Sequence, residues 1–185
     1  MVEESPPAAQ GLTVGFLGNM GYQPNVEAAI RLHRIVRTLR SRFDDLHLKI
    51  IGRAPTKEIL ELAGPHVEVT GPVDSIWVHL KQCDLMVFPM TSGAGLQNKL
   101  LESMHAGTPV IASTICLDPL GDDIDEVALR ADTDEEFLTA IDSLLSAPAR
   151  RHALGERTKK FVSRFKWEEI LPYYENIVLR AVGRS

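Results

Sequence analysis

The residues best suited to chemistry in this sequence lie between Gly93 and Glu102. Gly93 and Gly95 follow an apolar run, and glycines allow backbone N–H groups to approach a ligand closely. A helix expected from Gln97 would add unpaired N–H groups and partial positive charge, which suit an anion. Lys99 opposes the dipole of that helix, and a conflict of this kind is typical of a site that holds an anion.

The spacing of Lys99 and Glu102 suggests how such a ligand would lie. The two residues are three apart, so they would share one face of the helix. The lysine would then lie beside the phosphates of the ligand, and the carboxylate one turn further along would suit the paired hydroxyls of a ribose. The alternative is a solvated lysine–glutamate pair on an exposed helix, worth under ~1 kcal/mol to folding.

Three weaker candidates follow other expected strands. Gly18 lies in a GxxGxxG stretch, residues 15–21, where glycine would bring the backbone close to a phosphate, although a plain flexible loop fits equally well. Arg53 follows another strand, where its guanidinium could hold a phosphate in bidentate fashion; a solvated loop arginine also fits. Val73 ends a tight turn that could present backbone groups to a flat base.

Short apolar strands alternate with helices along the chain. Strands are expected at 12–17, 46–51, 67–70, 85–88, 109–112 and 127–129. Helices are expected at 24–43, 57–63, 74–82, 97–106, from 133 onward, at 149–164 and at 167–182. This alternation predicts an α/β domain over residues 11–185, with a Rossmann-like, doubly wound parallel sheet of about six strands, after a disordered lead-in at 1–10. Such sheets bind ligands at the carboxyl ends of their strands, where the candidate loops lie.

Composition narrows the class of protein. The 185 residues include 20 Lys and Arg against 25 Asp and Glu, and the net charge of −5 disfavours a general nucleic-acid binder. No apolar run approaches the ~18 residues of a membrane span, and the acidic, Pro-rich start does not resemble a signal peptide, so we expect a cytoplasmic protein. Cys83 and Cys116 are expected to be buried thiols, and the six histidines show no metal-ligand spacing, so no metal or cofactor is predicted.

A family resemblance rests mainly on residues 93–112, which read GAGLQNKLLESMHAGTPVIA. This stretch resembles the donor-site signature of the retaining glycosyltransferases of family 4 (group 1), in a bacterial polysaccharide type. Residues 18–25, 48–52, 67–73 and 165–174 support the resemblance, which covers about residues 12–182. These enzymes have the GT-B fold, in which two Rossmann-like domains face a cleft, and the chain resembles their C-terminal, nucleotide-sugar-binding half.

The resemblance implies roles for individual residues. Glu102 matches the carboxylate that binds the donor ribose, and Lys99 matches a position beside the diphosphate. The loop of Gly93, Ala94 and Gly95 lies beside the sugar, with Asn98 in the same donor-site stretch, while Gly18 and Asn19 match the loop under the phosphates. Two features depart from the family. The usual glutamate eight positions before Glu102 is Ala94, and the usual Arg and Lys are missing from residues 19–22, so Lys99 and Arg53 are expected to supply the charge.

The resemblance implies retaining transfer from a nucleotide-diphosphate sugar to a saccharide or lipid-linked acceptor. Lys99 would act in catalysis by stabilising the departing diphosphate, without a metal. The acceptor site would come from an N-terminal domain missing from this chain, so the isolated domain is expected to be inactive, and the full-length enzyme could associate peripherally with a membrane. Two alternatives stay open: an NADP-binding dehydrogenase domain, against which the glycine spacing and Pro24 argue, and a non-catalytic nucleotide-binding regulatory module, which Ala94 favours.

Overall fold

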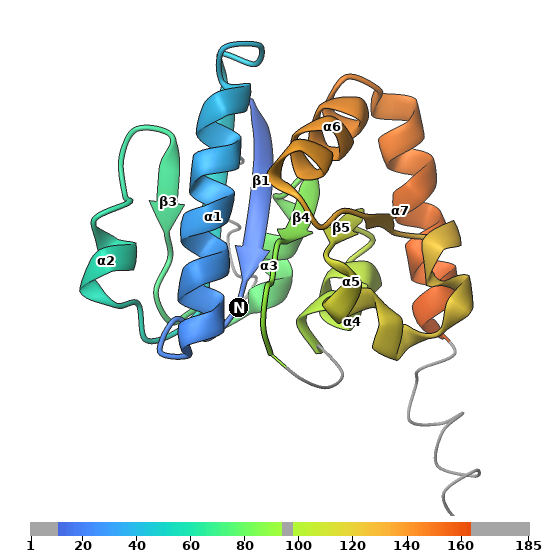
Figure 1. The fold of residues 1–185 in the computed structure, drawn as a ribbon, viewed down its shortest axis with the longest axis horizontal. Helices are drawn as coiled ribbons and strands as arrows, with labels where there is room; N and C mark the ends of the chain where they lie inside the picture. Colours follow the sequence, from blue (N-terminus) through green and yellow to red (C-terminus); the bar gives the residue numbers. More distant parts are fainter. Residues whose placement is uncertain (1–10, 94–97, 164–185) are drawn as a thin grey trace, which may run out of the picture.

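A computed structural model describes residues 11–93 and 98–163 of the chain (Figure 1). Its centre is a six-stranded sheet in the order β3-β2-β1-β4-β5-β6, and every strand pair in it is parallel. The strands are β1 Leu12–Leu17, β2 Leu46–Ile51, β3 Val67–Val69, β4 Leu85–Phe88, β5 Val110–Ala112 and β6 Leu129–Arg130. The predicted doubly wound parallel sheet is therefore confirmed. The predicted lead-in at 1–10 and the last predicted helix, at 167–182, lie outside the described residues.

Helices cover both faces of this sheet, with α1 and α6 on one face and α3 and α4 on the other (Figure 1). The α-helices are α1 Gln23–Leu39, α2 Lys57–Leu60, α3 Ile76–Lys81, α4 Asn98–His105, α5 Thr114–Leu117, α6 Asp134–Leu145 and α7 Pro148–Val162. Two 3₁₀ turns, η1 Asp118–Leu120 and η2 Asp122–Glu126, precede β6. α7 packs against α4 and α6, so the end of the described chain closes the flank of the domain.

The core lies on both sides of the two central strands, β1 and β4. All four residues of β4 are buried, as expected for a parallel strand covered on both faces. Phe16 of β1 and Phe88 of β4 pack with their ring centroids 5.8 Å apart. Both thiols, Cys83 and Cys116, are buried and unbridged, as the sequence predicted.

Several element boundaries differ from the prediction. α1 ends at Leu39 instead of Phe43, because the Leu39 carbonyl accepts from two successive N–H groups and closes the last turn. α3 begins at Ile76 instead of residue 74, because the backbone of Ser75, the residue before it, is extended. The last strand is Leu129–Arg130 instead of 127–129, and α5 and η1 follow β5 in a stretch where no helix was expected. The helix expected from residue 133 is confirmed as α6, which begins with a capping box formed by Thr133 and Glu136.

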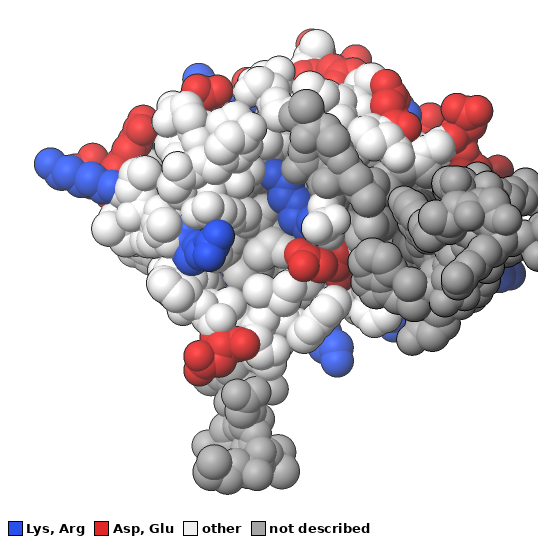
Figure 2. Space-filling view, turned by 90° about the horizontal axis from the view of Figure 1, so that it is seen from below, with Lys and Arg blue, Asp and Glu red and all other residues white. Residues whose placement is uncertain are grey.

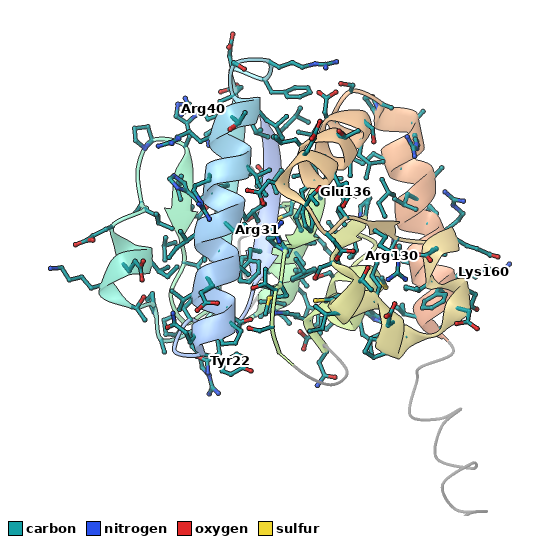
Figure 3. All side chains as sticks on the ribbon, in the orientation of Figure 1. Tyr22, Arg31, Arg40, Arg130, Glu136 and Lys160 are labelled. Carbon is teal, nitrogen blue, oxygen red and sulfur yellow. The ribbon has the colours of Figure 1, made fainter. Side chains whose placement is uncertain are left out.

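Arg31 of α1, whose side chain is only 13% exposed, fixes the chain where β4 ends (Figure 3). Its guanidinium donates to the Pro89 carbonyl at 3.2 Å and to the Asp132 carbonyl at 2.7 Å. It also pairs with the Asp134 carboxylate, with 2.6 Å between Nε and Oδ1. Because Pro89 is the first residue after β4, these bonds hold the start of the loop that leads to Gly93.

Candidate functional site

A cleft of about 660 Å³ lies at the carboxyl edge of the sheet. Figure 2 looks onto this edge and shows basic and acidic side chains set around a hollow. The described residues that line the cleft are Leu17, Gly18, Asn19, Tyr22, Asn25, Gly52, Arg53, Pro72, Val73, Ile76, Asn98, Lys99 and Glu102. They come from the segments after β1, β2 and β3 and from α1, α3 and α4, so the cleft lies where a doubly wound sheet binds its ligands.

The cleft has a wall of three loops joined by hydrogen bonds. The N–H of Gly18 donates to the Ile51 carbonyl at 3.0 Å, and the N–H of Met20 donates to the Arg53 carbonyl at 2.9 Å. These two bonds join the loop after β1 to the loop after β2. The N–H of Gly52 donates to the Thr70 hydroxyl at 3.3 Å, which joins the second loop to the segment after β3.

Gly52 is the residue that lets these loops approach so closely. Its φ of 138° lies in the region that favours glycine. A Cβ at this position would also collide with the Gly18 carbonyl oxygen. The sequence therefore needs glycine here for the cleft wall to close.

Lys99 lies on the opposite wall, in the first turn of α4, and its ammonium reaches across to α1. Its Nζ donates to the Asn25 Oδ1 at 2.7 Å and contacts the Met90 sulfur at 3.3 Å. The same Nζ lies 5.3 Å from the ring centroid of Phe16 and 5.6 Å from that of Phe88, within cation–π range. The ammonium therefore sits against rings and an amide, with no carboxylate of the described chain paired to it.

This surrounding changes the acid–base behaviour of the lysine. Burial lowers the pKa of Lys99 from 10.5 to about 8, and the neighbouring Cys116 thiol partly opposes that change. Lys99 is still mostly protonated at pH 7, but its charge is poorly solvated. An anion in the cleft would favour that charged form electrostatically.

Glu102 lies one turn further along α4 and lines the same cleft. Burial raises the pKa of its carboxyl, which forms no hydrogen bond or ion pair with any described residue. The guanidinium of Arg53, on the far wall, likewise has no partner within the described chain. The interpretation of Lys99 and Glu102 as a solvated surface ion pair is wrong, because Lys99 bonds to Asn25 instead.

Most of the residues singled out from the sequence come together in this cleft. Gly18, Asn19, Arg53, Val73, Asn98, Lys99 and Glu102 all line it. Gly93 is not among the lining residues, although its φ of 111° explains why glycine occupies that position. Ala94 and Gly95 lie outside the described residues.

Sequence reasoning missed Asn25 as part of the site. It lies in the first turn of α1, next to the apolar residues Val26, Ala28 and Ala29 that face the core. A polar residue on the buried side of a helix was the available signal. Nothing in the spacing showed that Asn25 would meet a lysine 74 residues further along the chain.

Across residues 11–93 and 98–163, no group of three His, Cys, Asp or Glu side chains is arranged to hold a metal ion. Within the same ranges, no helix has the length and apolar character needed to cross a bilayer.

A family model described as "Glycosyl transferases group 1" matches residues 11–147, which is most of the chain. The chain belongs to the group 1 glycosyltransferases. It is therefore a domain of a glycosyltransferase, and the dehydrogenase alternative is not favoured.

Curated relatives of the chain are also named as glycosyl-transferring enzymes. A phosphatidyl-myo-inositol mannosyltransferase from Mycolicibacterium smegmatis is 28% identical over 181 residues, covering 91% of this chain and 46% of the relative. A phosphatidyl-myo-inositol mannosyltransferase from Mycobacterium leprae is 31% identical over 110 residues, covering 57% of this chain and 29% of the relative. The chain thus spans less than half the length of these relatives.

Solved structures agree on the fold. A glycosyltransferase from Rickettsia africae has a TM-score of 0.79 at 14% identity, covering 95% of this chain and 49% of the other. Sucrose-phosphate synthase from Thermosynechococcus elongatus has a TM-score of 0.77 at 20% identity, covering 96% of this chain and 47% of the other. The C-terminal domain of a group 1 glycosyl transferase from Francisella tularensis has a TM-score of 0.67 at 16% identity and is matched over 84% of its length and 82% of this chain.

Proposed function

We propose that this domain binds the nucleotide-diphosphate sugar donor of a retaining glycosyltransferase in the cleft between Lys99 and Arg53. The observation that carries the proposal is the poorly solvated Lys99 ammonium, in a cleft at the carboxyl edge of the sheet that it shares with the Glu102 carboxylate, which has no partner among the described residues. A volume of about 660 Å³ falls within the range of small-molecule sites. Family membership makes a sugar donor the natural ligand.

In this proposal the diphosphate lies against Lys99, with the loop at Gly18 and Asn19 beneath it, and Arg53 contributes a second cation. The carboxylate of Glu102 accepts hydrogen bonds from the ribose hydroxyls, and the Pro72–Val73 turn borders the base. When the glycosidic bond breaks, negative charge grows on the leaving diphosphate. Lys99 then stabilises the transition state more than the ground state, which raises the rate of transfer.

Other parts of the proposal rest on the family resemblance alone. They are retention of configuration, a saccharide or lipid-linked acceptor and peripheral membrane association of the whole enzyme. A cytoplasmic location is proposed as well, from the sequence itself. The curated relatives are named as mannosyltransferases, so a mannosyl donor should be among the first donors tested. Because the chain spans less than half of those relatives, we propose that a separate domain supplies the acceptor site and that this domain alone turns over poorly.

Isothermal titration calorimetry of the domain tests the donor site. Uridine, guanosine and adenosine diphosphates are titrated in separate experiments, each with EDTA and again with magnesium. We expect weak binding of at least one diphosphate in EDTA, with NADP giving no comparable heat. Absence of heat with all three diphosphates would contradict the proposal, and binding that requires magnesium would contradict its metal-free part.

A further inference from the structure

Asn25 occupies an unusual place in the cleft, because it connects the two elements that would hold the diphosphate. It lies in the first turn of α1 and is only 7% exposed. Its Nδ2 donates to the Asn19 carbonyl at 3.0 Å, and its Oδ1 accepts from the Lys99 Nζ at 2.7 Å. One side chain therefore ties the loop after β1 to the lysine of α4.

The two partners fix the orientation of this amide. An ammonium can only donate and a carbonyl can only accept, so Oδ1 must face Lys99 and Nδ2 must face Asn19. The fit is also tight around the amide, since a Cβ at Gly18 would lie 2.9 Å from the Asn25 side chain. No other common side chain of this size offers one donor and one acceptor in the required directions. Aspartate has the shape but would place an oxygen against the Asn19 carbonyl.

The charge of the partner matters as much as its shape. Among the described residues of β1, β4 and the segment after β4, the Lys99 ammonium contacts Phe16, Phe88 and Met90, none of which carries a charge. Within residues 11–93 and 98–163, the titratable groups near the ammonium are the Cys116 thiol of α5 and Glu102 on α4 itself. Asn25 is thus a neutral acceptor, which leaves the positive charge of the lysine uncompensated.

We propose that Asn25 is a positioning residue that holds the Lys99 ammonium in place for an anion without neutralising the charge of the lysine. A carboxylate at the same position would also hold the ammonium but would neutralise it. The ligand in this inference rests on the proposed function, whereas the effect of Asn25 on Lys99 concerns the unliganded domain and does not.

The test compares Asn25→Asp and Asn25→Ala with the wild-type chain. Gln23→Glu is the matched control, because it adds the same charge as Asn25→Asp two residues away, on an exposed side chain of the same helix end outside the cleft lining. NMR of the lysine side chain measures the pKa of Lys99 in each unliganded protein. Calorimetry then measures the affinity for uridine diphosphate and for uridine.

Asn25→Asp should raise the pKa of Lys99 by about one unit or more, because an opposite charge favours the ammonium. Asn25→Ala should not raise it. Both variants should weaken uridine diphosphate binding at least about tenfold and change uridine binding far less, because only the diphosphate depends on the positioned, uncompensated charge of the Lys99 ammonium. Gln23→Glu should change none of these quantities.

Two results would overturn the inference. One is an unchanged Lys99 titration in Asn25→Asp, and the other is wild-type affinity for uridine diphosphate in both Asn25 variants. If Asn25→Asp does not fold, the affinities of Asn25→Ala decide. If the wild-type chain itself binds no diphosphate, the proposed function fails, and the NMR titration alone then supports or overturns the role of Asn25.

Discussion

Replacing Lys99 with methionine should make the unliganded domain more stable while lowering its affinity for a diphosphate. Methionine keeps an unbranched apolar stem against Phe16 and Phe88 but removes the ammonium. A residue kept for folding would show the opposite result on stability. The pair of effects therefore separates a functional lysine from a structural one.

The magnitude follows from the pKa of Lys99, which burial lowers from 10.5 to about 8. One pKa unit is about 1.4 kcal/mol, so the buried ammonium costs the folded state up to about 3 kcal/mol at neutral pH. The lost bond to Asn25 offsets about 1 kcal/mol of the gain. We expect Lys99→Met to raise the free energy of unfolding by about 1–2 kcal/mol at pH 7.

The sign of the pH dependence provides an internal check. The folded pKa lies below the unfolded one, so the unfolded chain binds more protons between about pH 8 and 10.5. The penalty is fully present below pH 8 and disappears as the pH rises through that window. The stability advantage of Lys99→Met should therefore fade between pH 8 and 10.5.

Urea unfolding at pH 7 and at pH 10 measures this difference, and calorimetry measures the binding. Affinity for uridine diphosphate should fall about tenfold or more, while that for uridine stays within about twofold. Lys57→Met is the control, because that side chain is 91% exposed on α2 and lies outside the cleft lining. A destabilised Lys99→Met that binds uridine diphosphate like the wild type would refute the reasoning.

Three further predictions use the same cleft. Affinity for uridine diphosphate should fall as the pH rises past about 8, because Lys99 loses its proton. Calorimetry from about pH 6.5 to about pH 9.5, roughly one and a half units on either side of the Lys99 pKa, should show no matching trend for uridine. Glu102→Gln should weaken uridine and its diphosphate alike, by up to about tenfold, since the ribose is common to both; a loss confined to the diphosphate would contradict the ribose assignment. Gly52→Ala should cost about 1–3 kcal/mol and lower the melting temperature, because its φ is positive and its Cβ meets Gly18; an unchanged melting curve would contradict the account of the cleft wall.

Much of the fold could be predicted because local signals agreed with the global arrangement. The continuous apolar run of β4 and the capping box at Thr133 each pointed to the observed element. Boundaries failed where structure depends on tertiary contacts. α5 and η1 are single turns whose buried residues, Cys116 and Leu117 among them, are held by the core, and no helical period shows over so few residues.

The candidate site was predictable where it depended on short-range spacing. Lys99 and Glu102 are three residues apart on one helix, so their shared face followed from the sequence. Asn25 became a site residue only through a contact across 74 positions, and the way Gly52 meets Gly18 likewise depends on the pairing of β1 with β2. Such contacts arise from the order of strands in the sheet, which no local pattern encodes.

The most direct test of the donor site is an NMR titration of the labelled domain with uridine, guanosine and adenosine diphosphates. The account predicts that the backbone amide shifts will change at Gly18, Gly52, Val73 and Lys99, which border one cleft although they are far apart in sequence. The surface between β6 and α6, around Arg130 and Thr139, should remain unchanged. Changes confined to that second surface, or no changes with any of the three diphosphates, would contradict the assignment of this cleft as the donor site.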